Sequence, residues 1–182
     1  MAHNTIIRSL HDVGLAAWFG GTLANAVALN AAAAAPRSDH DKGTVVNVGW
    51  DRWTPVNAAA IGAHLVGASG LLLANRGRVA AQQGVGSMTI AKTVLTAAAL
   101  GVTAYSRLLG RTVSARTDVA IASATQPVEA TPADVASAQK QLRILQWAVP
   151  ALTGAMVVLS SLAGEQQRPS EVRRGLLRRI AS

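Results

Sequence analysis

Two histidines lie in or beside long apolar stretches of this sequence, where an imidazole has few partners. His11 lies two residues before the first run without charged residues, which begins at Val13, and His64 lies inside the second run. A histidine in such a segment is usually buried in the protein interior. There it can form a hydrogen bond, carry a proton or ligate haem or a metal. These two side chains are the first candidates for chemistry.

Small and hydrogen-bonding residues recur around both histidines at steps of three and four, which places them on one helix face. The candidate intramembrane polar site consists of His11, Trp18, Asn25, Asn57, His64, Gln146 and Thr153. We expect these faces to meet in the interior and to join the helices by hydrogen bonds, with Asn25 and Asn57 at similar depth. The alternative is that they line a polar cavity, a ligand pocket or an ion path.

The expected register separates the two histidines in depth. If Thr5 and Asn75 lie at one membrane face, antiparallel helices put His11 and His64 about 7–8 Å apart along the membrane normal, at a rise of about 1.5 Å per residue. Trp18 would then be level with His64. The offset argues against one shared ion, so we expect no metal and no haem cofactor. A bis-histidine haem would need a shift in register.

Composition restricts the remaining chemistry. The chain has no cysteine, which excludes disulfides, thiolate metal sites and iron–sulfur clusters. It also has no HExxH motif, paired carboxylates or recognisable pairing of a nucleophile with a base, so we expect no enzyme activity. The net charge of +8 does not indicate nucleic acid, because the basic residues lie between and after apolar segments. Anionic lipid headgroups are the simpler partner.

Runs with few or no charged residues define the architecture. Only 14% of the residues are charged, against about 25% in typical proteins. A transmembrane helix needs about 20 predominantly apolar residues. We predict four spans, near residues 6–35, 53–75, 87–107 and 143–164. The fold class is all-α: a four-helix bundle in the membrane, with residues 1–182 forming one domain.

The segments between the spans predict turns and one extension. Residues 37–43 read as a polar turn, and residues 45–50 as a short segment at the membrane interface. Thr131 and Pro132 have the residue types of a helix start. The third and fourth helices are therefore expected to continue beyond the membrane as a projecting helical hairpin that turns near Gln126 and Pro127.

The C-terminal segment, residues 168–182, is a basic amphipathic tail. Its candidate contacts with anionic lipid are Arg173, Arg174, Arg178 and Arg179. The alternative is a docking site for a protein partner. An even number of spans puts both termini on one side, and the density of basic charge in the tail favours the cytoplasm. We expect a multi-pass protein of the inner (plasma) membrane.

The first span resembles a known family. The stretch His11-Asp-Val-Gly-Leu-Ala-Ala-Trp-Phe-Gly-Gly21 is similar to the first span of a poorly characterised four-helix bacterial membrane family related to the copper-resistance protein CopD. The stretch Arg107-Leu-Leu-Gly-Arg-Thr112 after the third span is similar as well. The resemblance implies four spans and metal transport. The chain departs from it by lacking cysteine and a methionine-rich cluster, which soft copper ligation would require.

Three functions remain open. The first is a non-enzymatic scaffold or accessory subunit of a membrane assembly, with a membrane protein partner or a second copy of the chain. The second is a small transporter, or a protein that handles metal or protons, using His11 and His64. The third is a b-type haem protein.

Overall fold

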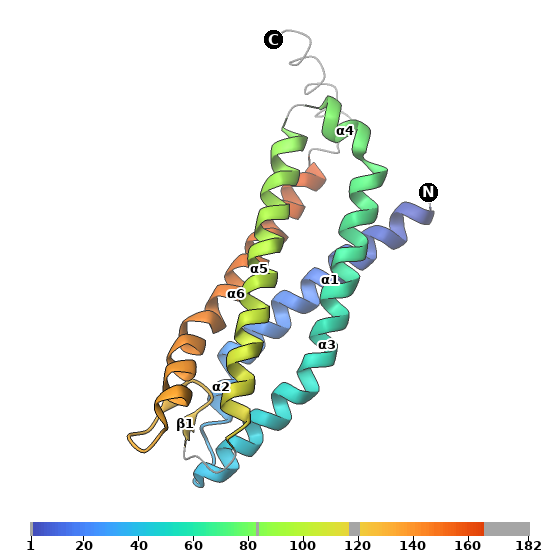
Figure 1. Ribbon diagram of the computed structural model, residues 1–182. Coiled ribbons are helices and arrows are strands. Elements are labelled where there is room, and N and C mark those ends of the chain that lie inside the picture. The colour runs from blue at the N-terminus through green and yellow to red at the C-terminus, as the bar shows by residue number, and fades with distance from the viewer. Residues whose placement is uncertain (1, 83, 117–120, 166–182) are drawn as a thin grey trace.

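Residues 2–82, 84–116 and 121–165 are described by the computed structural model (Figure 1). Long helices dominate this part of the chain. In order, the elements are helix α1 (Ala2–Ala24), π-helix η1 (Asn25–Leu29), α2 (Asn30–Ala32), α3 (Asp39–Ala74), α4 (Arg76–Ala81), α5 (Val85–Ser114), strands β1 (Ile121–Ser123) and β2 (Gln126–Pro127), and α6 (Ala133–Glu165).

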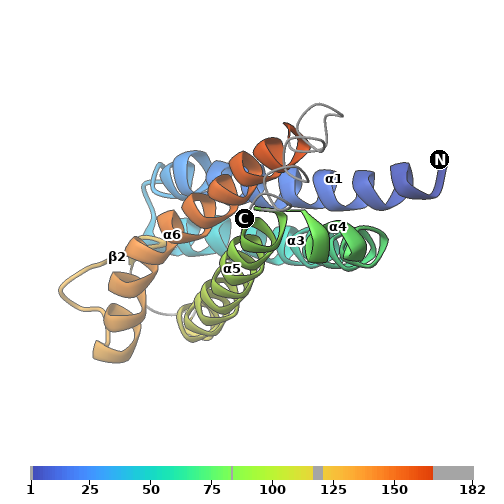
Figure 2. The same cartoon turned by 90° about the horizontal axis from the view of Figure 1, so that it is seen from above.

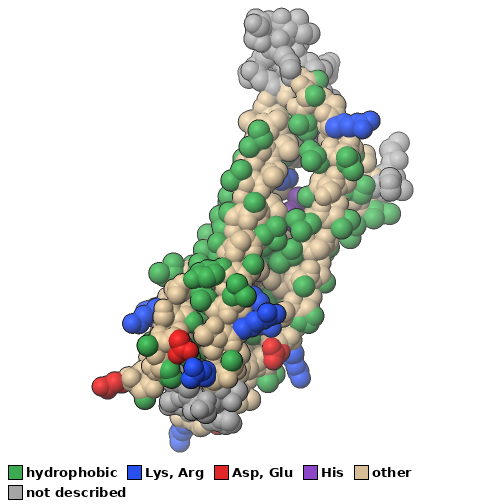
Figure 3. All heavy atoms as spheres, in the orientation of Figure 1, with side chains coloured by type: hydrophobic (Ala, Val, Ile, Leu, Met, Phe, Trp, Pro, Cys, Tyr) green, Lys and Arg blue, Asp and Glu red, His purple; other side chains and the backbone are tan. Residues whose placement is uncertain are grey.

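The all-α prediction is confirmed. Four helical stretches are long and apolar enough to cross a membrane: Asn4–Ala32, Asp41–Ala74, Val85–Ser114 and Ala133–Glu165. Large apolar side chains cover much of their outer surface (Figure 3), and Val13, Leu73 and Ile144 are each more than two-thirds exposed. Apolar side chains facing outward along all four helices are typical of a surface that contacts lipid.

The second long helix begins earlier than predicted. The residues expected to form a polar turn and an interfacial segment, 37–43 and 45–50, lie largely within α3. The side chain of Ser38 accepts a hydrogen bond from the backbone N–H of Asp41 and caps the helix. Polar residues readily form the first turns of a helix once a cap has satisfied its first N–H donors. The polar composition of this segment therefore did not exclude it from the helix.

The helices pack along three of the four sides of the bundle. Helix α1 runs obliquely behind α3 and α5 in Figure 1 and packs against both α3 and α6, while α5 packs against α6 (Figure 2). The described parts of α3 and α5 have no comparable packing. Near one end, Ser114 Oγ donates to Asn47 Oδ1 at 2.8 Å, and Arg107 lies 3.9 Å from Asp51. The gap between α3 and α5 therefore remains open along much of its length.

The projecting helical hairpin is not confirmed. Helix α5 does continue to Ser114, and α6 does begin at Ala133, but the described link between them contains the antiparallel pair β1 and β2. This pair folds back onto the bundle: Ala124 clusters with residues of α3, and Gln139 donates to the carbonyl of Ser123 at 3.1 Å. Pro127 lacks a backbone N–H and favours a break in the helix. The basic tail, residues 168–182, lies outside the described residues.

Candidate functional site

Two cavities lie in the gap between α3 and α5, one toward each end. The first, of about 420 Å³, lies toward α4 and is lined by residues of α1, α3, α4, α5 and α6. The second, of about 370 Å³, lies toward β1 and β2. Leu100 lines both cavities. Figure 3 shows the opening between α3 and α5, with histidine and basic side chains at its floor.

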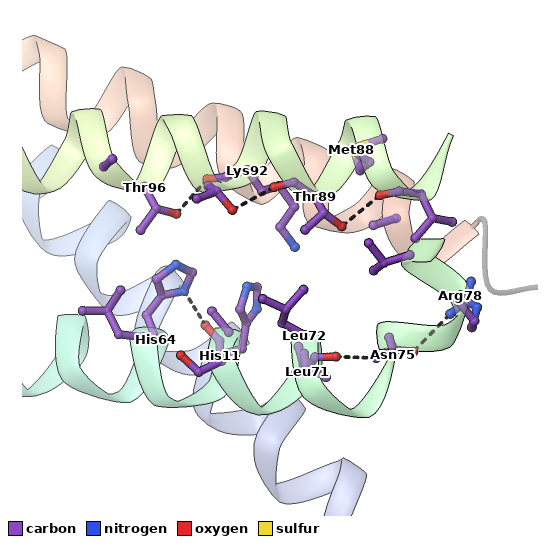
Figure 4. Close-up of a pocket in the computed structure, with 18 of the residues that line it drawn as sticks. His11, His64, Leu71, Leu72, Asn75, Arg78, Met88, Thr89, Lys92 and Thr96 are labelled. Carbon is purple, nitrogen blue, oxygen red and sulfur yellow. Dashed lines mark hydrogen bonds between the residues drawn. The ribbon is translucent and has the colours of Figure 1, made fainter. Parts of the chain in front are cut away.

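The first cavity contains both candidate histidines. Their ring centroids are only 4.6 Å apart, and His11 and His64 are almost completely buried (Figure 4). The predicted stagger of about 7–8 Å in depth is therefore too large. Close contact between α1 and α3 sets a different register, with the backbone of His11 against Gly67 and that of His64 against Gly14. This register leaves an offset of three residues, about 4.5 Å, and the rings meet across it.

Hydrogen bonding fixes which nitrogen of His64 carries a proton. His64 Nδ1 lies 3.2 Å from the backbone carbonyl oxygen of His11, which accepts hydrogen bonds only. Nδ1 therefore donates, and in the neutral ring Nε2 is a bare acceptor. Nε2 is buried and has no hydrogen-bond partner among the described residues. His11 Nδ1 lies 2.7 Å from Asp12 Oδ1, which orients the second ring.

The prediction that His64 faces the bundle interior near Trp18 is confirmed. The two ring centroids lie 6.2 Å apart, and Trp18 is fully buried. Leu15 and Met156 belong to the same buried cluster as the indole. Trp18 thus forms part of the wall behind the histidine pair.

The two rings do not fit opposite sides of one haem iron. Metal–nitrogen bonds of about 2 Å hold trans axial imidazoles with ring centroids about 6 Å apart, whereas these centroids are 4.6 Å apart. Both Nδ1 atoms already have partners. Within the described residues, no group of three His, Cys, Asp or Glu side chains is placed to hold a metal ion.

Lys92 gives the first cavity a basic character. Its side chain extends from α5 toward the two histidines on the opposite wall (Figure 4). Arg78 lies on α4, hydrogen-bonded to Gln82 and Asn75. No acidic residue of the described chain lines this cavity. The lining thus combines two cations and two imidazoles, which favours a negatively charged occupant.

The second cavity is close to neutral and has unusual polar walls. Arg107 is its only charged lining residue in the described chain, and the Arg107 side chain lies 3.9 Å from a carboxylate oxygen of Asp51. Six buried polar atoms of its lining residues have no hydrogen-bond partner among the described residues. They are Asn25 Nδ2, Asn30 Oδ1, Trp53 Nε1, Asn57 Oδ1, Thr103 Oγ1 and Ser106 Oγ.

The seven predicted residues fall into two groups with one exception. His11 and His64 line the first cavity, with Trp18 packed behind His64. Asn25, Asn57 and Gln146 line the second. Thr153 is buried but lines neither cavity, because its hydroxyl donates to the Val149 carbonyl of its own helix at 2.8 Å.

Some lining residues were not predicted. Lys92 was not among the predicted site residues, although its position in the series Thr89, Lys92, Thr93 and Thr96 puts it on the polar face of α5. Trp53 and Asn30 were not among the predicted site residues either. The intervals from Asn25 to Asn30 and from Trp53 to Asn57 are five and four residues. Only the second of these intervals is a regular α-helical repeat.

The fold and the outer surface define a class. Four long apolar helices with exposed apolar faces indicate a multi-pass membrane protein, here one with two cavities between its helices. Comparisons with family models, curated proteins and solved structures find no match for this chain. The resemblance to the CopD-related family therefore stays a prediction.

Proposed function

We propose that this chain is a non-enzymatic transport protein that moves a small anion together with a proton through the first cavity. The observation that carries the proposal is the cluster of His11, His64 and Lys92 in one cavity without a lining carboxylate. These side chains come from three different helices, α1, α3 and α5. Lys92 thus faces the two histidines from a helix that does not pack closely against α3.

The roles follow from the hydrogen bonds. The Lys92 ammonium supplies three donors and a fixed positive charge to the anion. His64 Nε2 is the proton acceptor, since Nδ1 is already occupied by the carbonyl of His11. Protonation of His64 adds a second positive charge beside the first. Anion binding and proton binding therefore stabilise each other, which is the requirement for coupled movement.

Flux into proteoliposomes tests the proposal. The protein is reconstituted with pyranine inside, and a gradient of chloride, formate or phosphate is applied at a clamped membrane potential. We expect at least one anion to enter faster than into protein-free vesicles and to change the internal pH. Lys92→Met should lower the anion flux about tenfold or more, while His64→Gln should lower the proton flux per anion.

Lys140→Met provides the matched control, because Lys140 is exposed on α6 and lines neither cavity. Its flux should equal that of the unaltered protein. Equal flux through Lys92→Met and Lys140→Met would refute the role of the cavity. Flux of all three anions no faster than in protein-free vesicles would refute the transport proposal itself.

A scaffold or accessory subunit is the second candidate, and the open side between α3 and α5 favours it. A helix of a partner, or of a second copy, would bury the exposed Leu72, which lies at this open side on α3. Purification in a mild detergent with size determination by light scattering tests this. A stable stoichiometric complex supports the candidate, and a solitary chain refutes it.

We also propose a location for the protein, from its apolar helices and the distribution of its basic residues. Four apolar helices suit a multi-pass protein of the inner membrane. An even number of spans places both termini on one side, and the density of basic residues in the tail favours the cytoplasm. The first cavity, with Arg78 near α4, would then open toward the cytoplasmic half of the membrane.

A further inference from the structure

We infer that the second cavity is a binding site for an uncharged, membrane-soluble amphiphile whose head group both donates and accepts hydrogen bonds. This site is separate from the basic cavity around Lys92. It lies between η1, α3, α5 and α6, on the other side of Leu100.

Unpartnered polar atoms of the lining residues indicate which ligand groups would fit. Trp53 Nε1 and Asn25 Nδ2 are donors, whereas Asn30 Oδ1 and Asn57 Oδ1 are acceptors. The hydroxyls of Thr103 and Ser106 add groups that serve either way. A buried polar atom without a partner is unfavourable, most of all inside a membrane. A head group with both hydroxyl and carbonyl functions would satisfy donors and acceptors together.

The π-helix η1 builds one wall of the site. The backbone N–H of Asn30 donates to the carbonyl of Asn25, a bond over five residues. In an α-helix, residues five apart point about 140° away from each other. The wider π turn brings Asn25 and Asn30 onto the same cavity, and such turns recur at functional sites. Gln146 accepts a hydrogen bond from Asn30 Nδ2 at 2.8 Å and holds the Asn30 amide in place.

The indole of Trp53 packs into the space next to Gly21, where any larger residue would place a side chain. A Cβ on Gly21 would lie 1.9 Å from the six-membered part of the Trp53 indole, so the ring occupies the space that glycine leaves. This contact seats the ring against α1 while Trp53 lines the cavity. The indole therefore offers a fixed N–H donor rather than a mobile one.

Charge and access decide between ligand classes. The single lining cation lies near the carboxylate of Asp51, and no acidic side chain of the described residues lines the cavity, so neither an anion nor a cation is specifically favoured. Apolar residues such as Ile61, Leu145 and Val149 form much of the wall. The unpacked side between α3 and α5 gives access from the bilayer rather than from water alone. An apolar chain with a neutral polar head matches all of these features.

Three oleoyl compounds test the head-group requirement without any mutation. The full chain is purified in an amine-oxide detergent, which has no hydroxyl donors, and is titrated with 1-oleoylglycerol, methyl oleate or oleate while complexes are counted by native mass spectrometry. We expect one molecule of 1-oleoylglycerol to bind. Methyl oleate, which only accepts hydrogen bonds, and oleate, which is charged, should bind at least tenfold more weakly. Equal binding of the three compounds, or binding of none, overturns the inference.

Two variants then locate the bound molecule. Trp53→Phe removes the N–H, and Asn57→Leu removes the amide; each should weaken 1-oleoylglycerol binding about tenfold, the effect of one lost hydrogen bond. Asn4→Leu is the matched control, since Asn4 is exposed and distant in sequence from the cavity lining. Thermal unfolding confirms that each variant is folded. Binding by Asn57→Leu and Trp53→Phe at the level of Asn4→Leu overturns the assignment to this cavity.

Discussion

The contact between α1 and α3 leads to a sharp prediction about two glycines. A Cβ on Gly14 would lie 2.5 Å from the carbonyl oxygen of Ala60 and from the backbone nitrogen of His64. A Cβ on Gly67 would lie 2.3 Å from the backbone nitrogen of His11. All of these neighbours are backbone atoms, which no rotamer change moves aside. Alanine at either position must therefore separate the helices by about 1 Å.

The energy of this separation follows from known substitution effects. Overpacking costs about 1–3 kcal/mol, and the better helix propensity of alanine offsets up to about 1 kcal/mol. Gly14→Ala and Gly67→Ala should each lower the free energy of unfolding by about 1–2 kcal/mol. Gly62 and Gly101 are the controls, because a Cβ there meets no atom within 4 Å. Their alanine variants should be as stable as the unaltered protein, or slightly more stable.

Unfolding in mixed detergent micelles, followed by tryptophan fluorescence, measures these differences. Trp18 reports on the contact directly, since its ring lies 6.2 Å from that of His64. Separation of α1 from α3 should also lengthen the bond from His64 Nδ1 to the carbonyl of His11 and change the imidazole NMR signals. Equal stability of all four alanine variants would refute the close approach of the two helices.

Three further predictions concern the interior, the topology and haem. The hydrogen bond from Asn30 to Gln146 should contribute about 0.6 kcal/mol in a double-mutant cycle of Asn30→Leu and Gln146→Leu; additive effects would contradict it. Reporter tags at the two termini should show the same side of the membrane, and opposite sides would rule out four spans. Addition of haemin to the purified protein should give no bis-imidazole shift of the Soret band relative to haemin in detergent alone, because the rings of His11 and His64 are too close to flank one iron; such a shift, abolished by His64→Ala, would contradict this.

The four helices could be predicted because their signal is local. Each span is a run of apolar residues long enough to cross a bilayer. Such a run can be recognised from its own residues, whatever helices pack against it. The start of the last helix was readable for the same reason: α6 begins at Ala133, directly after Thr131 and Pro132, and the Pro132 carbonyl accepts from the Ala136 N–H. The early start of α3 was missed because its first turn, Asp39 to Lys42, is polar and was interpreted as a turn between helices.

The relation between the histidines could not be predicted, because it depends on register. The expected pairing of Thr5 with Asn75 implied an offset of five residues between His11 and His64. The observed contacts place His11 opposite Gly67, which reduces the offset to three. A shift of two residues is within the usual error of helix ends read from sequence. It was nevertheless enough to bring two rings into contact.

The division into two cavities also depends on packing that no single helix encodes. Asn25 and Asn57 were correctly placed in the interior, but the sequence offered no reason to separate them from the histidines. The separation arises where Leu100 enters the gap between α3 and α5 and lines both cavities. The polar face of α5 carries Lys92 on one side of this leucine and Thr103 on the other, so one helix supplies both sites.

The same gap explains why polar groups persist in these cavities. Helix α3 is held by its contact with α1 through Gly14 and Gly67, and α5 is held by α6, where Thr96 Oγ1 lies 3.1 Å from Met156 Sδ. Helices α3 and α5 are thus each positioned by packing against another helix, and not by packing against each other. The facing surfaces of α3 and α5 therefore do not have to pack against each other. They can accommodate polar residues such as Lys92, His64 and Asn57. A bundle closed on all four sides would have to bury these groups against apolar neighbours at a cost of several kcal/mol each.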